Sequence, residues 1–202
     1  IDAGNAEAIA LSAPNRSALS YKGLRNHCDQ IGKQLASQGL SNSDRVAIVL
    51  PNGPEMASAF LAVASYMSAA PLNPTYKKSE YAFYLEDLKP GLVIVEEKST
   101  NPVRAAASDL SIPVVEAKVK SGSPAGAFEL FQSEADIQPS NLDHEALVLH
   151  TSGTTSRPKV VPLLQRNILA STRNISASLE LTATDHCLNT VSYTHLTLPT
   201  RS

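Results

Sequence analysis

The sequence predicts an α/β fold in which a mainly parallel β-sheet is layered with helices. Short apolar runs that suit buried strands alternate along the chain with amphipathic stretches of helical period. This alternation is typical of parallel sheets, because a crossover segment, usually a helix, must join parallel neighbours. A hydrophobic content of 43% over 202 residues is enough to form a core.

The first predicted helix and strand follow from apolar spacing. Residues 21–38 have an amphipathic helical pattern that stops at Gly39, a residue type that commonly ends helices. The apolar stripe of this helix consists of Leu24, Cys28, Ile31 and Leu35. We therefore expect Cys28 to pack in the core. Residues 45–50 then predict a buried strand.

A turn over residues 51–54 leads into the second predicted helix. Pro54 takes the first helical position, where a backbone N–H is not needed. The apolar face of this helix consists of Met56, Phe60, Val63 and Met67. Ser79 is expected to cap a third helix that continues through Leu88.

The pattern continues with two further strands, at residues 92–95 and 112–115, separated by a weakly helical stretch at 103–110. Residues 118–127 contain two glycines, two serines and one proline. That composition predicts a surface connection or the boundary of a small subdomain.

A last helix is predicted over residues 164–181. Its apolar positions are Ile168, Leu169, Ile175 and Leu179. We expect this stripe to pack in the core and the amino end of the helix to lie near the preceding loop, where free amides favour anions.

That loop carries the clearest chemical signal of the chain. It follows the apolar residues 145–149 and reads Thr151-Ser-Gly-Thr-Thr-Ser-Arg-Pro-Lys159. Hydroxyls and backbone amides can donate to phosphate oxygens, a glycine permits close backbone approach, and a lysine adds a mobile positive charge. The candidate phosphate-binding residues are Thr151, Ser152, Gly153, Thr154, Thr155 and Lys159.

Two other loop types compete with this interpretation, a Walker-type P-loop and a surface loop without a ligand. A Walker-type P-loop requires glycine before the lysine and serine or threonine after it, whereas this chain has Pro158 and Val160. A surface loop rich in serine and threonine is the structural alternative, since such residues are common between elements. A strand followed by nine defined positions favours the phosphate-binding interpretation.

The loop resembles the signature of the adenylate-forming superfamily, which includes acyl-CoA and aryl-CoA synthetases, luciferases and peptide-synthetase adenylation domains. Upstream segments share the resemblance, so that it covers most of residues 16–188. These segments are residues 18–21, 44–55, 60–64 and 70–74. Residues 149–163 are most similar to the group of oxalate-CoA ligases and peroxisomal-coenzyme A synthetases. Many superfamily members have glycine at the position of Ser156 and glycine or alanine at the position of Val160, and both differences suit this group.

The resemblance implies a fold and an activity. The fold is the amino-terminal portion of the adenylate-forming large domain. The activity is ATP-dependent acid-CoA ligation, with ATP, its Mg²⁺ and coenzyme A as cofactors or co-substrates and a small carboxylic acid as partner. Oxalate is the expected acid. A coumarate-like or medium-chain fatty acid ligase and a non-catalytic nucleotide- or phosphate-binding module remain alternatives.

The resemblance also implies that much of the active site lies outside this chain. No segment resembles the family's adenine-binding aromatic motif, ribose-binding aspartate or carboxy-terminal catalytic lysine. We therefore expect an amino-terminal fragment without catalytic residues of its own and without activity alone. Residues 1–189 are expected to be a partial AMP-binding domain, and residues 190–202 a non-native tail in which His195 has no role.

Composition argues against several other classes of protein, namely nucleic-acid-binding, disulfide-rich, metal-binding and membrane-spanning proteins. A formal charge of −2 with no long basic run gives no reason to expect nucleic acid as a partner. Cys28 and Cys187 are far apart, and the five histidines lack metal-ligand spacing, so neither a disulfide scaffold nor a metal site is expected. No apolar run approaches the ~20 residues of a membrane span. The expected location is cytoplasmic or peroxisomal.

Overall fold

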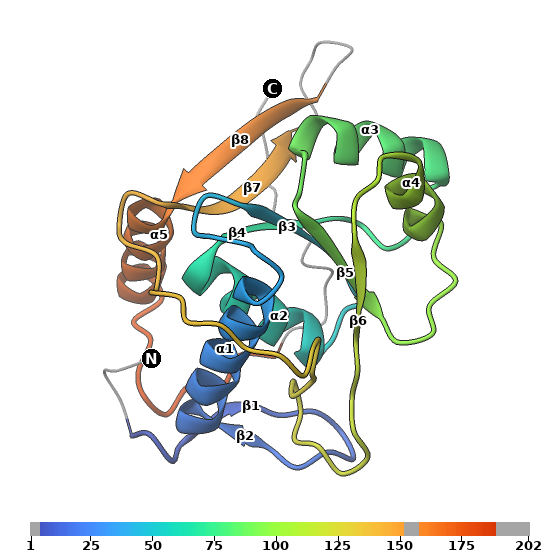
Figure 1. Cartoon of the computed structure of the whole chain (residues 1–202). Coiled ribbons are helices and arrows are strands. Elements are labelled where there is room, and N and C mark those ends of the chain that lie inside the picture. Colours follow the sequence, from blue (N-terminus) through green and yellow to red (C-terminus); the bar gives the residue numbers. More distant parts are fainter. Residues whose placement is uncertain (1–4, 152–157, 189–202) are drawn as a thin grey trace.

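A six-stranded sheet forms the centre of the computed structural model, which describes residues 5–151 and 158–188 (Figure 1). Its strands are β3 (Arg45–Val49), β4 (Ser68–Pro71), β5 (Leu92–Glu96), β6 (Val114–Ala117), β7 (Glu145–Thr151) and β8 (Lys159–Leu164). The spatial order is β6-β5-β3-β4-β7-β8. All neighbours are parallel except β7 and β8, which are antiparallel. The predicted α/β fold with a mainly parallel sheet is confirmed.

Helices cover both faces of the sheet and create two cores. On one face, α1 (Tyr21–Ala36) and α2 (Pro54–Tyr66) pack against alternate strand residues that include Val46 and Ile48. On the other face, α3 (Lys78–Leu88) and α4 (Val103–Asp109) pack against Ala47 and Val49. Successive strand residues point to opposite faces, so the part of β3 that is buried from both sides, residues 46–49, must be apolar.

Helix α1 begins and ends for identifiable local reasons. The hydroxyl of Ser20 accepts a hydrogen bond from the backbone N–H of Gly23 at 3.1 Å and so caps the first turn. Gly39 follows the helix with a φ of +83°, which glycine adopts without strain. The predicted apolar stripe is confirmed, because Leu24, Cys28, Ile31 and Leu35 are all buried. Burial raises the pKa of the Cys28 thiol to about 12, so it is a packing residue.

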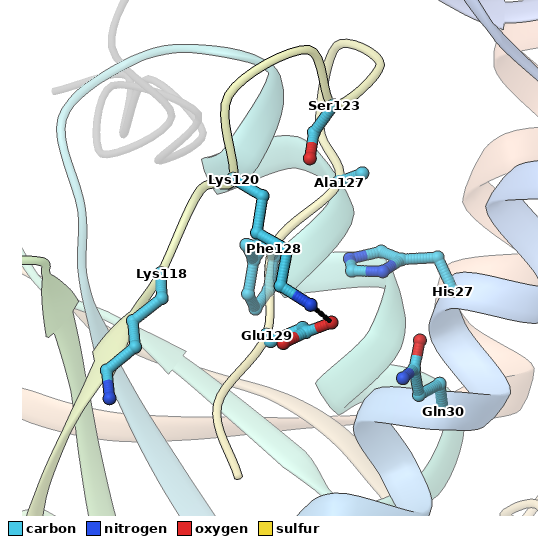
Figure 2. Close-up of a pocket in the computed structure, with 8 residues that line it drawn as sticks. All are labelled: His27, Gln30, Lys118, Lys120, Ser123, Ala127, Phe128 and Glu129. Carbon is cyan, nitrogen blue, oxygen red and sulfur yellow. Dashed lines mark hydrogen bonds and ion pairs between the residues drawn. The ribbon is translucent and has the colours of Figure 1, made fainter. Parts of the chain in front are cut away.

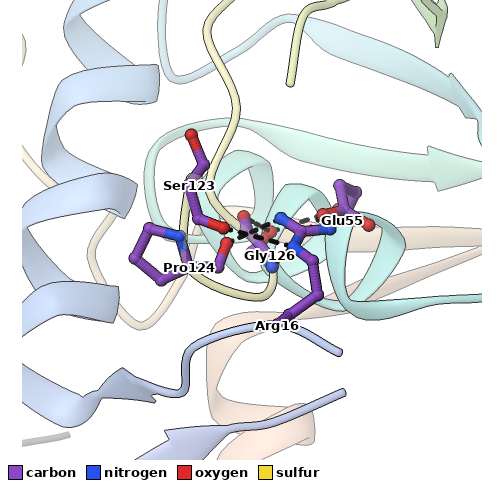
Figure 3. A network of polar contacts seen from close by, with 6 residues as sticks. Arg16, Glu55, Ser123, Pro124 and Gly126 are labelled. Carbon is purple, nitrogen blue, oxygen red and sulfur yellow. Dashed lines mark hydrogen bonds and ion pairs between the residues drawn. The ribbon is translucent and has the colours of Figure 1, made fainter. Parts of the chain in front are cut away.

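An arginine joins the first turn of α2 to the segment that precedes β7 in the chain (Figure 3). Arg16 pairs with Glu55 at 2.9 Å and donates to the carbonyls of Ser123 and Pro124 at 3.2 and 2.8 Å. Gly126 has a φ of +85°, and a Cβ there would lie 3.0 Å from the Pro54 carbonyl oxygen. The predicted surface connection at 118–127 is therefore partly anchored to α2.

Several element boundaries differ from the sequence predictions. Ser79 is not the cap of α3, because the helix begins at Lys78 and the carboxylate of Glu80 accepts from the N–H of Lys77 at 2.8 Å. The strand predicted at 112–115 is β6, two residues further along the chain. Strands β1 (Ile9–Leu11), β2 (Leu19–Ser20), β4 and β8 were not predicted. β1 and β2 form a separate antiparallel pair.

Helix α5 (Gln165–Ser178) confirms the last predicted helix, but its apolar stripe is not in the core. Within the described chain, none of its residues is buried. Leu169 is 43% exposed, Ile175 is 52% exposed, and Leu179 just after the helix is 65% exposed. The expectation of core packing for this stripe was wrong, because α5 lies against the β7–β8 hairpin at the side of the molecule (Figure 1).

None of the described helices is long and apolar enough to cross a membrane.

Matched truncations of one buried and one exposed isoleucine test this placement of α5. Ile31→Ala in α1 should lower the free energy of unfolding by ~2 to 5 kcal/mol, because it leaves a cavity in a closed core. Ile175→Ala in α5 should change it by less than ~0.5 kcal/mol, because half of that side chain is already in water. Urea unfolding of the chain measures both values. Equal destabilisation by the two variants would mean that α5 packs in the core of this chain.

Candidate functional site

The antiparallel β7–β8 hairpin brings the two described ends of the candidate phosphate loop together. Thr151, the last residue of β7, is the cross-strand partner of Lys159, the first residue of β8. Lys159 is exposed and Thr151 is half-buried. The other candidate residues, Ser152, Gly153, Thr154 and Thr155, lie outside the described residues.

The direction of β7 puts this pair at the carboxyl end of a strand that runs parallel to β3 and β4. Ligand sites of open α/β sheets lie beyond the carboxyl ends of the strands, where the connections are free to approach a ligand. Thr151 offers a hydroxyl donor and Lys159 an ammonium with three donors and a full positive charge. This end of the hairpin can therefore hold an anion.

The position of α5 corrects one expectation about the site. The sequence placed the amino end of this helix beside the phosphate loop, but β8 intervenes. At about 3.3 Å per residue, its six residues separate the two by about 20 Å. The first amide of α5, from Gln165, donates to the His144 carbonyl at 3.0 Å, at the opposite end of the hairpin. The amino end of α5 is therefore too far from the loop for its dipole to stabilise an anion there.

An ion pair fixes the start of β7 to the sheet. The guanidinium of Arg45 donates to both carboxylate oxygens of Glu145 at 2.8 and 2.9 Å, and also to the Leu88 carbonyl at 3.3 Å. Burial raises the pKa of Glu145, but hydrogen bonding and the charge of Arg45 outweigh it and hold that pKa below its usual value. The carboxylate is therefore charged at neutral pH, and its bidentate pairing fixes the orientation of β7.

A second polar contact reaches the other end of β7. His150 stands next to Thr151, and its Nε2 lies 3.0 Å from Oδ2 of Asp87 in α3. The Tyr84 ring contacts the imidazole at a centroid distance of 4.7 Å. Sequence reasoning missed this group, because 63 residues separate its polar partners and no local pattern links them. The one feature of the sequence that could have pointed to this contact is a histidine directly before the loop.

The described residues hold a small pocket elsewhere, between α1 and residues 118–129 (Figure 2). It measures about 110 Å³, and its lining includes His27, Lys118, Lys120 and Phe128. Nε2 of His27 has no hydrogen-bond partner among the described residues. The imidazole stands perpendicular to the Phe128 ring at 4.7 Å, a geometry that suits a weak contact between a ring N–H and an aromatic face. We assign His27 to packing.

The described residues contain no cluster of three or more histidine, cysteine, aspartate or glutamate side chains that could hold a metal ion. Thr151 and Lys159 instead offer a hydroxyl and an ammonium, which suit an anionic ligand.

Comparison with known protein families identifies the family of the chain. The profile of the AMP-binding enzyme family matches residues 2–198. The chain belongs to this family.

Two relatives with the same described activity are similar to the chain. The chain is 36% identical over 197 residues to an oxalate–CoA ligase from Arabidopsis thaliana, covering 90% of the chain and 38% of the relative. It is 34% identical over 169 residues to an oxalate–CoA ligase from Saccharomyces cerevisiae, covering 70% of the chain and 31% of the relative. The chain thus spans about a third of the length of the relatives it matches.

A solved structure supports the fold. Apo MatB from Rhodopseudomonas palustris superposes with a TM-score of 0.71 at 23% identity, covering 88% of this chain and 36% of MatB. MatB has also been solved with ATP bound, and that structure superposes with a TM-score of 0.69. At this level of identity the likeness establishes the fold.

The assignment of His27 to packing predicts a pH effect on stability. Burial lowers the pKa of His27 to about 4, and the nearby charge of Glu55 offsets only part of that. The unfolded chain binds the proton from about pH 6.5 downward, so stability falls as the pH drops from 6.5 towards 4. His27 should contribute a loss of about 2 kcal/mol between pH 8 and pH 5.

Chemical denaturation at both pH values measures this loss. His27→Leu should reduce the pH dependence by that amount, whereas His186→Leu, at an exposed position, should leave it unchanged. If His27→Leu and wild type lost stability equally on acidification, the imidazole would not be held neutral by burial.

Proposed function

We propose that this chain supplies the phosphate-binding part of an ATP-dependent acid–CoA ligase. The observation that carries the proposal is the pairing of Thr151 with Lys159 at the end of the β7–β8 hairpin, in a chain of the AMP-binding family. The hydroxyl-rich residues 151–155 lie between these two strands in the sequence. The oxalate–CoA ligase relatives and the ATP-bound MatB structure support the same assignment.

The proposed reaction has two steps. A carboxylate oxygen attacks the α-phosphorus of MgATP, the bond to the bridging oxygen breaks, and pyrophosphate leaves as an acyl-adenylate forms. The thiol of coenzyme A then attacks the acyl carbon, which releases AMP and gives the thioester. Both reactants of the first step are anions, so neutralising and aligning the phosphates is the main task of the protein.

The residues of this chain would act on the leaving end of the nucleotide. The hydroxyls of Thr151, Ser152, Thr154 and Thr155 would donate to β- and γ-phosphate oxygens, and Gly153 would let the backbone approach. Lys159 would neutralise charge that builds up on pyrophosphate. Mg²⁺ enters with ATP as part of the substrate and supplies further charge neutralisation.

Oxalate is the proposed acid, because both oxalate–CoA ligases are more than 30% identical to the chain. A coumarate-like or medium-chain fatty acid would use the same phosphate contacts. A non-catalytic nucleotide-binding module would bind ATP without acid-dependent release of pyrophosphate, and the experiment below separates it from a ligase.

We further propose that residues 1–189 are part of a larger AMP-binding domain. The coverage of 38% and 31% of the two relatives supports this. The adenine, ribose, acid and coenzyme A contacts would come from the rest of a longer polypeptide, in the cytoplasm or a peroxisome. We place residues 190–202 outside the native domain, although the family match runs to residue 198.

Lys159→Ala tests the role of the lysine in a longer protein that contains this segment. Loss of one preorganised charge contact should slow acid-dependent exchange between ATP and labelled pyrophosphate by ~10 to 1000-fold. The matched control is Lys118→Ala, which removes the same charge from an exposed position outside the hairpin and should leave exchange unchanged.

The acid panel for this assay contains oxalate, coumarate and octanoate. Exchange with none of them by the wild-type protein would refute the ligase proposal for these acids. Equal rates for wild type and Lys159→Ala would remove the lysine from the mechanism.

A further inference from the structure

The end of β7 that carries Thr151 has little support from the sheet itself. β7 pairs with β4 at one position, Ala69 with Leu147, whereas β3 pairs with β4 at four positions. Thr151 lies four residues beyond this position, about 13 Å along the strand. Its other neighbour, β8, is the last strand of the described sheet and is attached to β7.

Helix α3 supplies the missing support. Figure 1 shows the carboxyl end of β7 beside α3. Val148 of β7 is buried in the same core as Leu85 and Leu88 of α3. Two residues further along, the His150 side chain is only 8% exposed and reaches Asp87 in the last turn of α3.

The chemistry of this contact determines which group donates the hydrogen bond and which accepts it. A carboxylate accepts hydrogen bonds, so Nε2 of His150 must carry the proton and donate to Oδ2 of Asp87 across 3.0 Å. A buried imidazole N–H without an acceptor would be unfavourable, so His150 is held to this partner. The contact joins a residue of β7 directly to the helix.

Aromatic rings restrict the imidazole further. The Tyr84 ring, one turn before Asp87 on α3, meets it at 66° with centroids 4.7 Å apart. Tyr76, in the connection between β4 and α3, stacks on Tyr84 at 5.0 Å and 14°. The imidazole is thus fixed by a hydrogen bond and by a packed ring, both from α3.

We infer that Asp87 and His150 are positioning residues for the phosphate-binding loop. They hold the end of β7, and with it Thr151 and Lys159, at the place where the nucleotide phosphates bind, without touching the nucleotide. The inference rests on the proposed function. It assigns to α3 a role in ATP binding that neither the motif nor the family match identifies.

The test uses a longer protein that contains this segment and measures steady-state acid-dependent AMP formation. Asp87→Ala should raise the KM for MgATP by ~5 to 50-fold, because Thr151 and Lys159 are then no longer held in the position that fits the phosphates. The KM for the acid should stay within about twofold. Mere destabilisation would reduce the fraction of active protein, which lowers kcat and leaves both KM values unchanged.

Conservative variants and a matched control separate the hydrogen bond from other effects. Asp87→Asn keeps an acceptor oxygen and His150→Gln keeps an N–H donor at a similar reach, so both should recover most of the MgATP affinity lost in Asp87→Ala and His150→Ala. Glu86→Ala removes a carboxylate from the neighbouring, exposed position of α3 and should behave as wild type. The double variant Asp87→Ala/His150→Ala should raise the KM for MgATP no more than either single alanine variant does, since all three break the same contact.

The outcomes are distinct. A wild-type protein without acid-dependent AMP formation would overturn the proposed function and this inference together. An active wild type whose Asp87→Ala variant lowers kcat alone, or matches Glu86→Ala, would overturn only the inference. A selective rise in the KM for MgATP, recovered by Asp87→Asn, would establish the positioning role.

Discussion

Burial of the central strands on both faces is the constraint on which the rest of the structure depends. Val46, Ala47 and Ile48 are fully buried because helices cover both sides of β3. A strand in this situation has no position for a polar functional side chain, since every residue faces one of the two cores. Polar functional side chains therefore lie at the strand ends and in the connections, as Thr151 and Lys159 do.

The same constraint explains which elements could be predicted. Residues 46–50 and 92–95 are apolar on both faces, and that signal needs no knowledge of neighbours. β4 was missed because Ser68, Ala69 and Ala70 are small and carry little strand preference. β8 contains Pro162, which argues against a strand unless it lies at an edge, and β8 is the outermost strand of the described sheet.

Missing β8 had a direct effect on the predicted site. Without that strand the loop leads straight into a helix, and the helix amino end becomes part of the phosphate site. With it, α5 moves to the far end of the hairpin, and its apolar residues Leu169 and Ile175 face outward. The candidate loop residues were predicted from local sequence, whereas the contact of His150 with Asp87 depends on the tertiary fold and could not be predicted.

Nuclear magnetic resonance tests most directly whether the open end of the β7–β8 hairpin binds polyphosphate. The chain is titrated with tripolyphosphate while backbone amide shifts are followed. We expect saturable shifts centred on Thr151 and Lys159 that are lost in Lys159→Ala. Shifts centred instead on Lys118 and Lys120 beside the His27 pocket, or none at the hairpin, would contradict this expectation.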